Sequence, residues 1–200
     1  MKELFKKQNE KTVKNLNATS VDKDGLYYDA MECLESGKSG VERAETLLQE
    51  ALNIDADYVQ THIGFAHMYG ASGNKKKAEE AIKEAYEMTL KAFPKWPRRL
   101  EWGFLENRAY LRALQYRADL YWDDDENDEA IKIFRLLLKL NPNDNQGVRY
   151  EIAGLYAGIN GKEVSRMFDE GNMKQDWSKL QKLVKDQNNK HHFWKEPKYD

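Results

Sequence analysis

The chain has 200 residues, of which 33% are charged and 40% hydrophobic, and its formal net charge is −2. This hydrophobic fraction excludes a disordered chain, and the balanced charge excludes a global field that would draw the protein to nucleic acid or an anionic membrane. The single cysteine, Cys33, excludes an internal disulfide. No apolar segment reaches signal-peptide or transmembrane length, so we expect a soluble cytoplasmic protein.

Residues 1–22 contain several lysines and few apolar side chains, which predicts a polar helix or arm before the first packed element. A first helix pair is predicted at residues 23–36 and 41–53. The glycine- and serine-rich segment 36–40 is typical of the turn between two such helices. A second pair is expected at about residues 57–93, again with a glycine-containing turn near its middle.

Small and large apolar residues recur after 34 residues across these two pairs. This period is typical of a repeated helical hairpin, in which each hairpin leaves one apolar face open for the next. The small residues are predicted to be contact points where two helices approach closely. The matching positions are Ala44 and Ala78, Leu48 and Ile82, and Ala51 and Ala85.

The period breaks after the second pair, since Ala130 follows Ala78 by 52 residues instead of 34. The insertion, near residues 90–108, contains two prolines and is predicted to begin as a stiff, non-helical corner. From Arg98 the apolar pattern is helical again and includes Trp102. We therefore expect the first helix of the third pair to be unusually long.

A fourth pair is predicted from apolar residues at helical spacing up to about residue 175. After it, residues 176–187 are predicted to form an amphipathic helix that caps the open face of the fourth pair, and residues 188–200 a tail. The apolar positions of the capping helix are Trp177, Leu180, Leu183 and Val184.

The first helices of the second and third pairs share a pattern of two residues three apart, a small residue next, and an aromatic residue three further on. The pattern is His62, Phe65, Ala66 and Tyr69, and then Leu114, Arg117, Ala118 and Tyr121. Together with the period, it resembles the tetratricopeptide repeat family, and the middle quarter of the chain is similar to such proteins of bacteria and archaea. The resemblance implies an all-α, right-handed superhelical solenoid of about four antiparallel helix pairs over residues 23–175.

Some positions depart from the family pattern. Arg117 and Glu151 stand where a large apolar residue is usual, and Glu32 where a small one is usual. Chaperone-type members hold a C-terminal carboxylate with a lysine and asparagine clamp, but the matching residues here are Asp29 and Cys33. That specificity is therefore not expected.

No catalytic, cofactor or metal site is predicted. The acidic run 123–129 begins like a calcium-binding loop, but Asp128 replaces the turn glycine and Phe134 the bidentate glutamate. His62 and His67 are five residues apart, which does not place two imidazoles on one helix face for zinc. We expect a protein that is not an enzyme.

The resemblance places the first helix of each pair along a concave groove. Groove positions in the third and fourth pairs are Arg112, Gln115, Gln146 and Arg149, with Trp122, Tyr156, Ile63 and His67 at neighbouring inner positions. Arginine's planar fork suits carboxylates, so this cluster favours recognition of an acidic segment. The alternative is a structural role, with Arg149 paired to Asp119 or Asp144.

We therefore predict a non-catalytic interaction module that binds an extended, acidic peptide segment of another protein in its groove, without a cofactor. The alternative is an RNA-binding helical repeat, since basic and aromatic residues interleave at 95–99 and 190–195. The net negative charge, and the lack of a basic stripe with the 34-residue period, disfavour nucleic acid.

Overall fold

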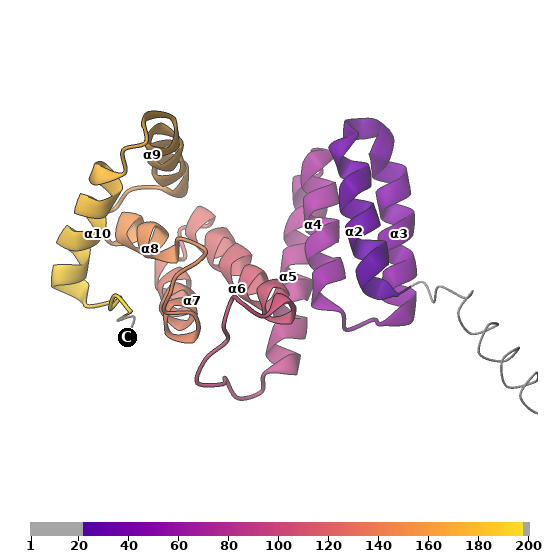
Figure 1. The fold of residues 1–200 in the computed structure, drawn as a ribbon, viewed down its shortest axis with the longest axis horizontal. Coiled ribbons are helices and arrows are strands. Elements are labelled where there is room, and N and C mark those ends of the chain that lie inside the picture. Colours follow the sequence, from indigo (N-terminus) through magenta and orange to yellow (C-terminus); the bar gives the residue numbers. More distant parts are fainter. Residues whose placement is uncertain (1–21, 198–200) are drawn as a thin grey trace, which may run out of the picture. The chain divides into compact units, whose positions relative to one another are not determined.

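The computed structural model describes residues 22–197, and the regular secondary structure in that range is helical (Figure 1). The predicted all-α helical repeat is confirmed. The chain divides into two compact units, one ending at Ala56 and the other beginning at Asp57. The division falls inside the repeat domain expected over residues 23–175. The predicted N-terminal arm lies outside the described residues, apart from its last residue.

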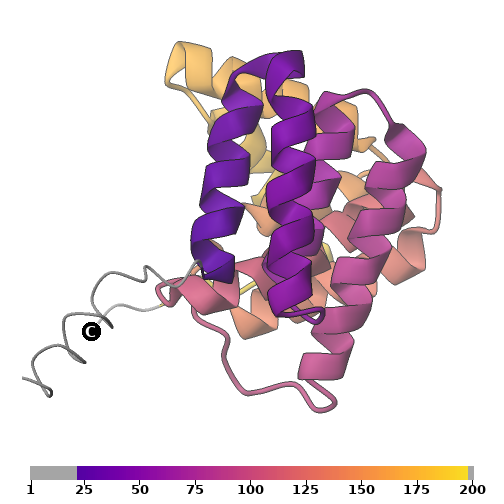
Figure 2. The same ribbon diagram turned by 90° about the vertical axis from the view of Figure 1, so that its right-hand side faces the viewer.

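The first unit contains helix α2 (Lys23–Glu35), the 3-10 turn η1 (Gly37–Gly40) and helix α3 (Val41–Ile54). Figure 2 shows the two long helices antiparallel and side by side. Helix α2 begins where the carboxylate of Asp22 accepts a hydrogen bond of 2.6 Å from the backbone N–H of Gly25. This cap satisfies one of the free donors at the helix N-terminus.

In the first hairpin, the turn before α3 lies directly against the backbone at the end of α2. A Cβ atom added at Gly40 would lie 1.7 Å from the carbonyl oxygen of Cys33, so only glycine fits there. On the next helix Ala44, Leu48 and Ala51 are all fully buried. The small residues of the repeat therefore lie at the helix contact, as their period predicts.

The second unit contains seven helices among its described residues, and each packs against the next along the chain. Most of its buried apolar residues form one core around the three middle helices. The helices are α4 (Val59–Ala71), α5 (Lys75–Ala92), α6 (Leu105–Asp123), α7 (Asn127–Leu140), α8 (Val148–Tyr156), α9 (Gly161–Lys174) and α10 (Ser178–His191).

The inserted segment is non-helical for longer than the sequence predicts. Helix α6 has 19 residues against 13 in α4 and 9 in α8, so its expected extra length is confirmed, but it begins at Leu105 and not at Arg98. The segment before it is held by tertiary contacts, because the buried Leu100 donates its N–H to the carbonyl of Leu140 at 2.8 Å. Arg108 also donates to the carbonyl of Trp102 at 3.0 Å, which satisfies a loop acceptor.

The repeat register differs in detail between hairpins. Ala130 is fully buried at the contact between α6 and α7, as predicted. Ala78 is only partly buried, contrary to the sequence prediction, and Ile82 is likewise partly exposed. The buried residues of α5 are Ala81, Ala85 and Thr89, so of the three predicted contact positions on this helix only Ala85 is fully buried. The period located the repeats and this one contact, but it did not predict which neighbouring positions of α5 are buried.

The C-terminal helix α10 packs mainly on α8 and carries the buried residues Leu180 and Val184. It extends to His191, beyond the expected end at 187. The chain that follows is also docked: Phe193 is buried, and the indole N–H of Trp194 donates to the carbonyl of Pro142 at 3.1 Å. Through these buried residues, α10 and the chain after it cover part of the main core next to α8.

Enlarging Ala130 should test the helix contact. Ala130→Leu should lower the free energy of unfolding by about 1 to 3 kcal/mol, because a larger side chain overpacks the α6–α7 contact. Ala78→Leu, at the equivalent and partly exposed position, should lower it less. Urea unfolding of both variants measures the difference, and equal effects would contradict the register described for α5.

Candidate functional site

The candidate site is a pocket of about 680 Å³ in the second unit, bordered by α6, α8 and α9. This volume lies in the range of pockets that bind small ligands or side chains. Its lining combines carboxylates, aromatic rings and a few polar or basic groups. The acidic and aromatic members are Asp119, Asp123, Glu151, Asp169, Trp122, Tyr150 and Phe168, and the remaining polar or basic ones are Gln146, Lys162, Ser165 and Arg166.

The indole of Trp122 forms part of the pocket wall because two glycines let the following helices lie against it. A Cβ atom added at Gly154 would lie 3.4 Å from this indole and 2.3 Å from Val164, and one added at Gly161 would lie 3.5 Å from the indole. The indole also forms an edge-to-face contact with Phe134, with ring centroids 6.2 Å apart. Because Gly154 and Gly161 have no side chains, α8 and the start of α9 can pack directly against the indole.

A chain of hydrogen bonds joins the loop before α8 to α6 and then to α8. The side-chain amide of Gln146 donates to Gln115 at 2.7 Å, and the amide of Gln115 donates to Oε1 of Glu151 at 2.8 Å. The other carboxylate oxygen of Glu151, Oε2, is buried and has no hydrogen-bond partner. Gln115 thus orients the Glu151 carboxylate and leaves one of its oxygens unsatisfied.

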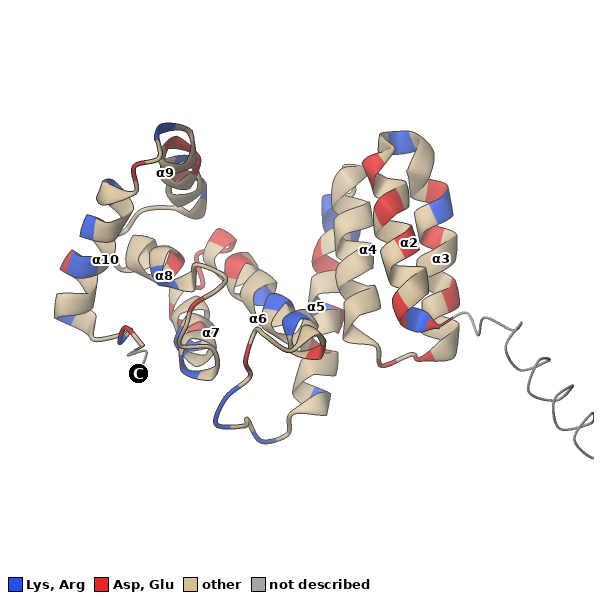
Figure 3. Ribbon diagram, viewed as in Figure 1, with Lys and Arg blue, Asp and Glu red and all other residues tan. Residues whose placement is uncertain are grey.

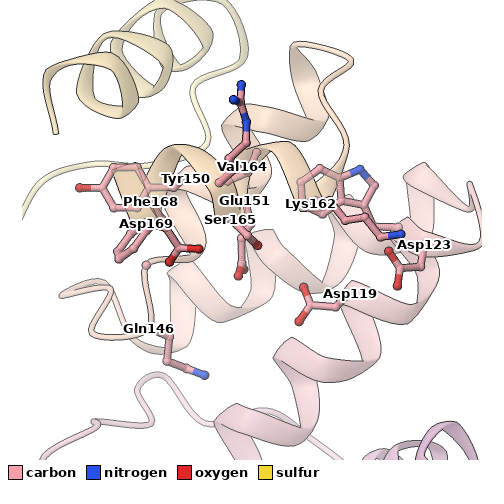
Figure 4. Close-up of a pocket in the computed structure, with 14 residues that line it drawn as sticks. Asp119, Asp123, Gln146, Tyr150, Glu151, Lys162, Val164, Ser165, Phe168 and Asp169 are labelled. Atoms are coloured by element: carbon pink, nitrogen blue, oxygen red, sulfur yellow. The ribbon is translucent and has the colours of Figure 1, made fainter. Parts of the chain in front are cut away.

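Two of the carboxyl groups have strongly perturbed ionisation. Burial, and then the charge of Asp123, raise the pKa of Asp119 to about 7. Burial, and then the charge of Asp119, raise the pKa of Glu151 well above its ordinary value. Asp119 lies near the C-terminal end of α6 and Glu151 in the first turn of α8, and both side chains face the pocket (Figure 4). Near neutral pH, a positive charge between them would favour their ionised forms.

The residues predicted to line the groove are only partly brought together. Gln115 and Gln146 are hydrogen-bonded to each other, and Trp122 lines the same pocket as Gln146. Ile63 is 1% exposed and packs in the core with α5 and α6, so its side chain is not available to a ligand. Tyr156 stacks on His191 with ring centroids 3.9 Å apart, and it does not line the pocket.

Arg149 is not the uncompensated cation that the sequence prediction required. Its guanidinium donates to the buried carboxylate of Asp144 at 2.8 Å and to the hydroxyl of Tyr150 at 2.7 Å. It also lies over the ring of Trp194, 5.1 Å from the centroid. Of the two partners considered for it, the structure selects Asp144, and Arg149 stabilises the start of α8.

Arg112 and His67 form a separate cluster on α6 and α4. Arg112 lies over the ring of Trp102, 5.4 Å from its centroid. His67 shares a hydrogen bond of 3.0 Å with the hydroxyl of Tyr116, and burial and then the charge of Arg112 lower the pKa of His67. The two arginines predicted to act together thus have different partners.

Sequence reasoning missed the carboxylates of the pocket. The one signal was the departure at Glu151, a charged residue where the repeat pattern expects a large apolar one. Asp119 carried no such signal. Figure 3 shows acidic and basic residues on both α6 and α8, so charge along either helix does not single out the pocket.

No group of three or more histidine, cysteine, aspartate or glutamate side chains in residues 22–197 could hold a metal ion. In the same range, no helix is both long and apolar enough to cross a membrane.

Comparison with known families decides the relationship. A family model described as tetratricopeptide repeat matches residues 59–91 and 111–144, which are α4 with α5 and most of α6 with α7. The chain contains tetratricopeptide repeats at these two places. No curated protein and no solved structure gives a significant match. Tetratricopeptide repeats generally mediate protein–protein interaction and are typically non-catalytic.

Replacing Asp119 should test the ionisation of the pocket of this repeat-containing protein. The raised pKa means that the folded state binds a proton between about pH 4 and 7 that the unfolded state has released, so stability falls as pH rises through this window. Asp119→Asn has no ionisable group at this position, so its stability should not fall in this way as pH rises. At about pH 8 it should be more stable than the parent, by on the order of 1 to 3 kcal/mol, and near pH 4 the difference should be small.

Urea unfolding at both pH values measures the effect. The matched control is Asp124→Asn, which removes an exposed carboxylate after the end of the same helix and should change stability by less than about 0.5 kcal/mol. A variant at position 119 that destabilises the protein at high pH would show that the Asp119 carboxylate is stabilised in the folded state.

Proposed function

We propose that this repeat-containing protein is a non-catalytic interaction module that binds an extended segment of a partner protein in the pocket of α6, α8 and α9. The observation that carries the proposal is the pocket itself, where the first helices of two successive pairs border a hollow with three aromatic side chains. Aromatic walls suit side chains of a peptide, and large aromatic residues are enriched where binding energy concentrates.

The charge of the pocket sets which segment fits it. The sequence alone suggested an acidic partner held by arginines, but Arg149 already pairs with Asp144. The lining has four carboxyl groups against the two cations Lys162 and Arg166. An acidic segment would meet like charges here, so we propose a segment that is neutral or basic where it enters the pocket.

Blocking the pocket should abolish peptide binding. Peptides are first selected from a phage-displayed random library on the immobilised full chain, then synthesised with a fluorescent label. Ser165→Trp fills the pocket from an exposed position on α9 and should weaken binding of the selected peptides by at least about tenfold, or about 1.4 kcal/mol. Fluorescence anisotropy measures the affinity.

Asn172→Trp is the matched control, because it adds the same side chain at an exposed position of the same helix that does not line the pocket. It should leave binding unchanged. A library that yields no binder, or binders indifferent to Ser165→Trp, would overturn the proposal. A labelled oligouridine tests the RNA alternative, which would replace the proposal if the RNA bound at about 0.15 M salt and no peptide did.

A further inference from the structure

Two carboxyl groups face the pocket from different helices without a cation between them. Asp119 comes from α6 and Glu151 from α8, and Figure 4 shows both directed into the space bordered by these helices. In the part of the chain that the structure describes, no ion pair joins either carboxyl group to a lysine or arginine. The pocket therefore presents two carboxyl groups that no ion pair among the described residues compensates.

Glu151 adds a second, independent observation. One of its oxygens accepts a hydrogen bond from Gln115, while Oε2 is buried and has no partner. A buried acceptor without a partner loses its hydrogen bonds to water and gains none in return, so such atoms are rare unless a ligand or water satisfies them. Because Gln115 fixes the carboxylate, the free oxygen is held in place for a donor that comes from outside the chain.

None of the nearby cations forms an ion pair with Asp119 or Glu151 among the described residues. The guanidinium of Arg149 is held by Asp144, and that of Arg166 pairs with Glu163 on its own helix at 2.6 Å. Lys162 lines the pocket but makes no ion pair with the two carboxyls among the described residues. The described residues therefore leave the two carboxyls open to a positive charge from the bound partner.

We infer that the pocket recognises an arginine side chain of the bound segment, with its guanidinium between Asp119 and Glu151 and its stem against the aromatic wall. This inference rests on the proposed function. Arginine fits better than lysine because its planar fork can donate to two carboxyl groups at once and can stack on aromatic rings such as Trp122. A lysine at the same place would bind more weakly, through a single compact charge.

The pocket also makes recognition dependent on pH. The cation requires ionised carboxyls, and burial raises the pKa of both Asp119 and Glu151. The other charged groups that line the pocket are Asp123 on α6 and Lys162, Arg166 and Asp169 on α9. Binding of an arginine peptide should therefore strengthen as pH rises from about 6 to 8.

The test uses the full chain and the labelled peptides selected from the library. Each selected arginine is replaced by citrulline, which keeps the shape of the side chain but removes its charge. At one position, citrulline should weaken binding to the parent by about tenfold or more. In the double variant Asp119→Asn with Glu151→Gln the same replacement should have no further effect, because the paired charges are already absent. Substitution of that arginine by lysine should give an intermediate affinity.

Asp124→Asn with Glu126→Gln is the matched control, since it removes two exposed carboxylates from the neighbouring turn outside the pocket. It should preserve the full effect of citrulline. If the double pocket variant does not fold, Asp119→Asn alone, together with the pH profile of the arginine and citrulline peptides, serves the same purpose. The arginine peptide should gain affinity as pH rises, while the citrulline peptide should not.

The outcomes separate this inference from the proposed function. Peptides that bind in the pocket, as judged by Ser165→Trp, but tolerate citrulline at every arginine would overturn the inference and leave the proposed function intact. Citrulline effects of equal size in the parent and in the double pocket variant would also overturn it. Failure to select any peptide would overturn the proposed function itself.

Discussion

Close approach of paired helices is the constraint on which the rest of this structure depends. Helices can pack at short distance only where their facing side chains are small, and fully buried alanines occupy these positions in several helices. At Gly40 even a methyl group would collide with the backbone of Cys33. The small residues recur with the 34-residue period of the sequence, because each hairpin needs them at its own helix contact.

The same constraint shapes the pocket. Gly154 and Gly161 let α8 and the start of α9 lie on the indole of Trp122, so the ring is both a packing element and part of the wall. Because Gln115 holds the Glu151 carboxylate by a hydrogen bond, this group does not have to be ordered by a ligand. Preorganisation of this kind reduces the entropy lost on binding.

The buried carboxyls oppose stability, because burial raises the pKa of both and one oxygen of Glu151 has no hydrogen-bond partner. A large apolar residue, which is usual at the position of Glu151, would fill the same place without an unsatisfied oxygen. Groups that weaken a fold are commonly found where activity needs them, since binding sites trade stability for recognition. This is why the departure of Glu151 from the repeat pattern is informative about function as well as about packing.

The period, the turns and the amphipathic helices are local properties, and the sequence by itself therefore determined the helix pairs, the repeat family and the unusual length of α6. Only the tertiary structure decided where α6 begins, because Leu100 is held by the end of α7 through a contact between residues far apart in the chain. It likewise paired Arg149 with Asp144, and it stacked Tyr156 on His191. A side chain on a helix surface has several partners within reach, and which one it meets depends on how neighbouring helices pack, so the charge of the pocket could not be obtained from the repeat pattern.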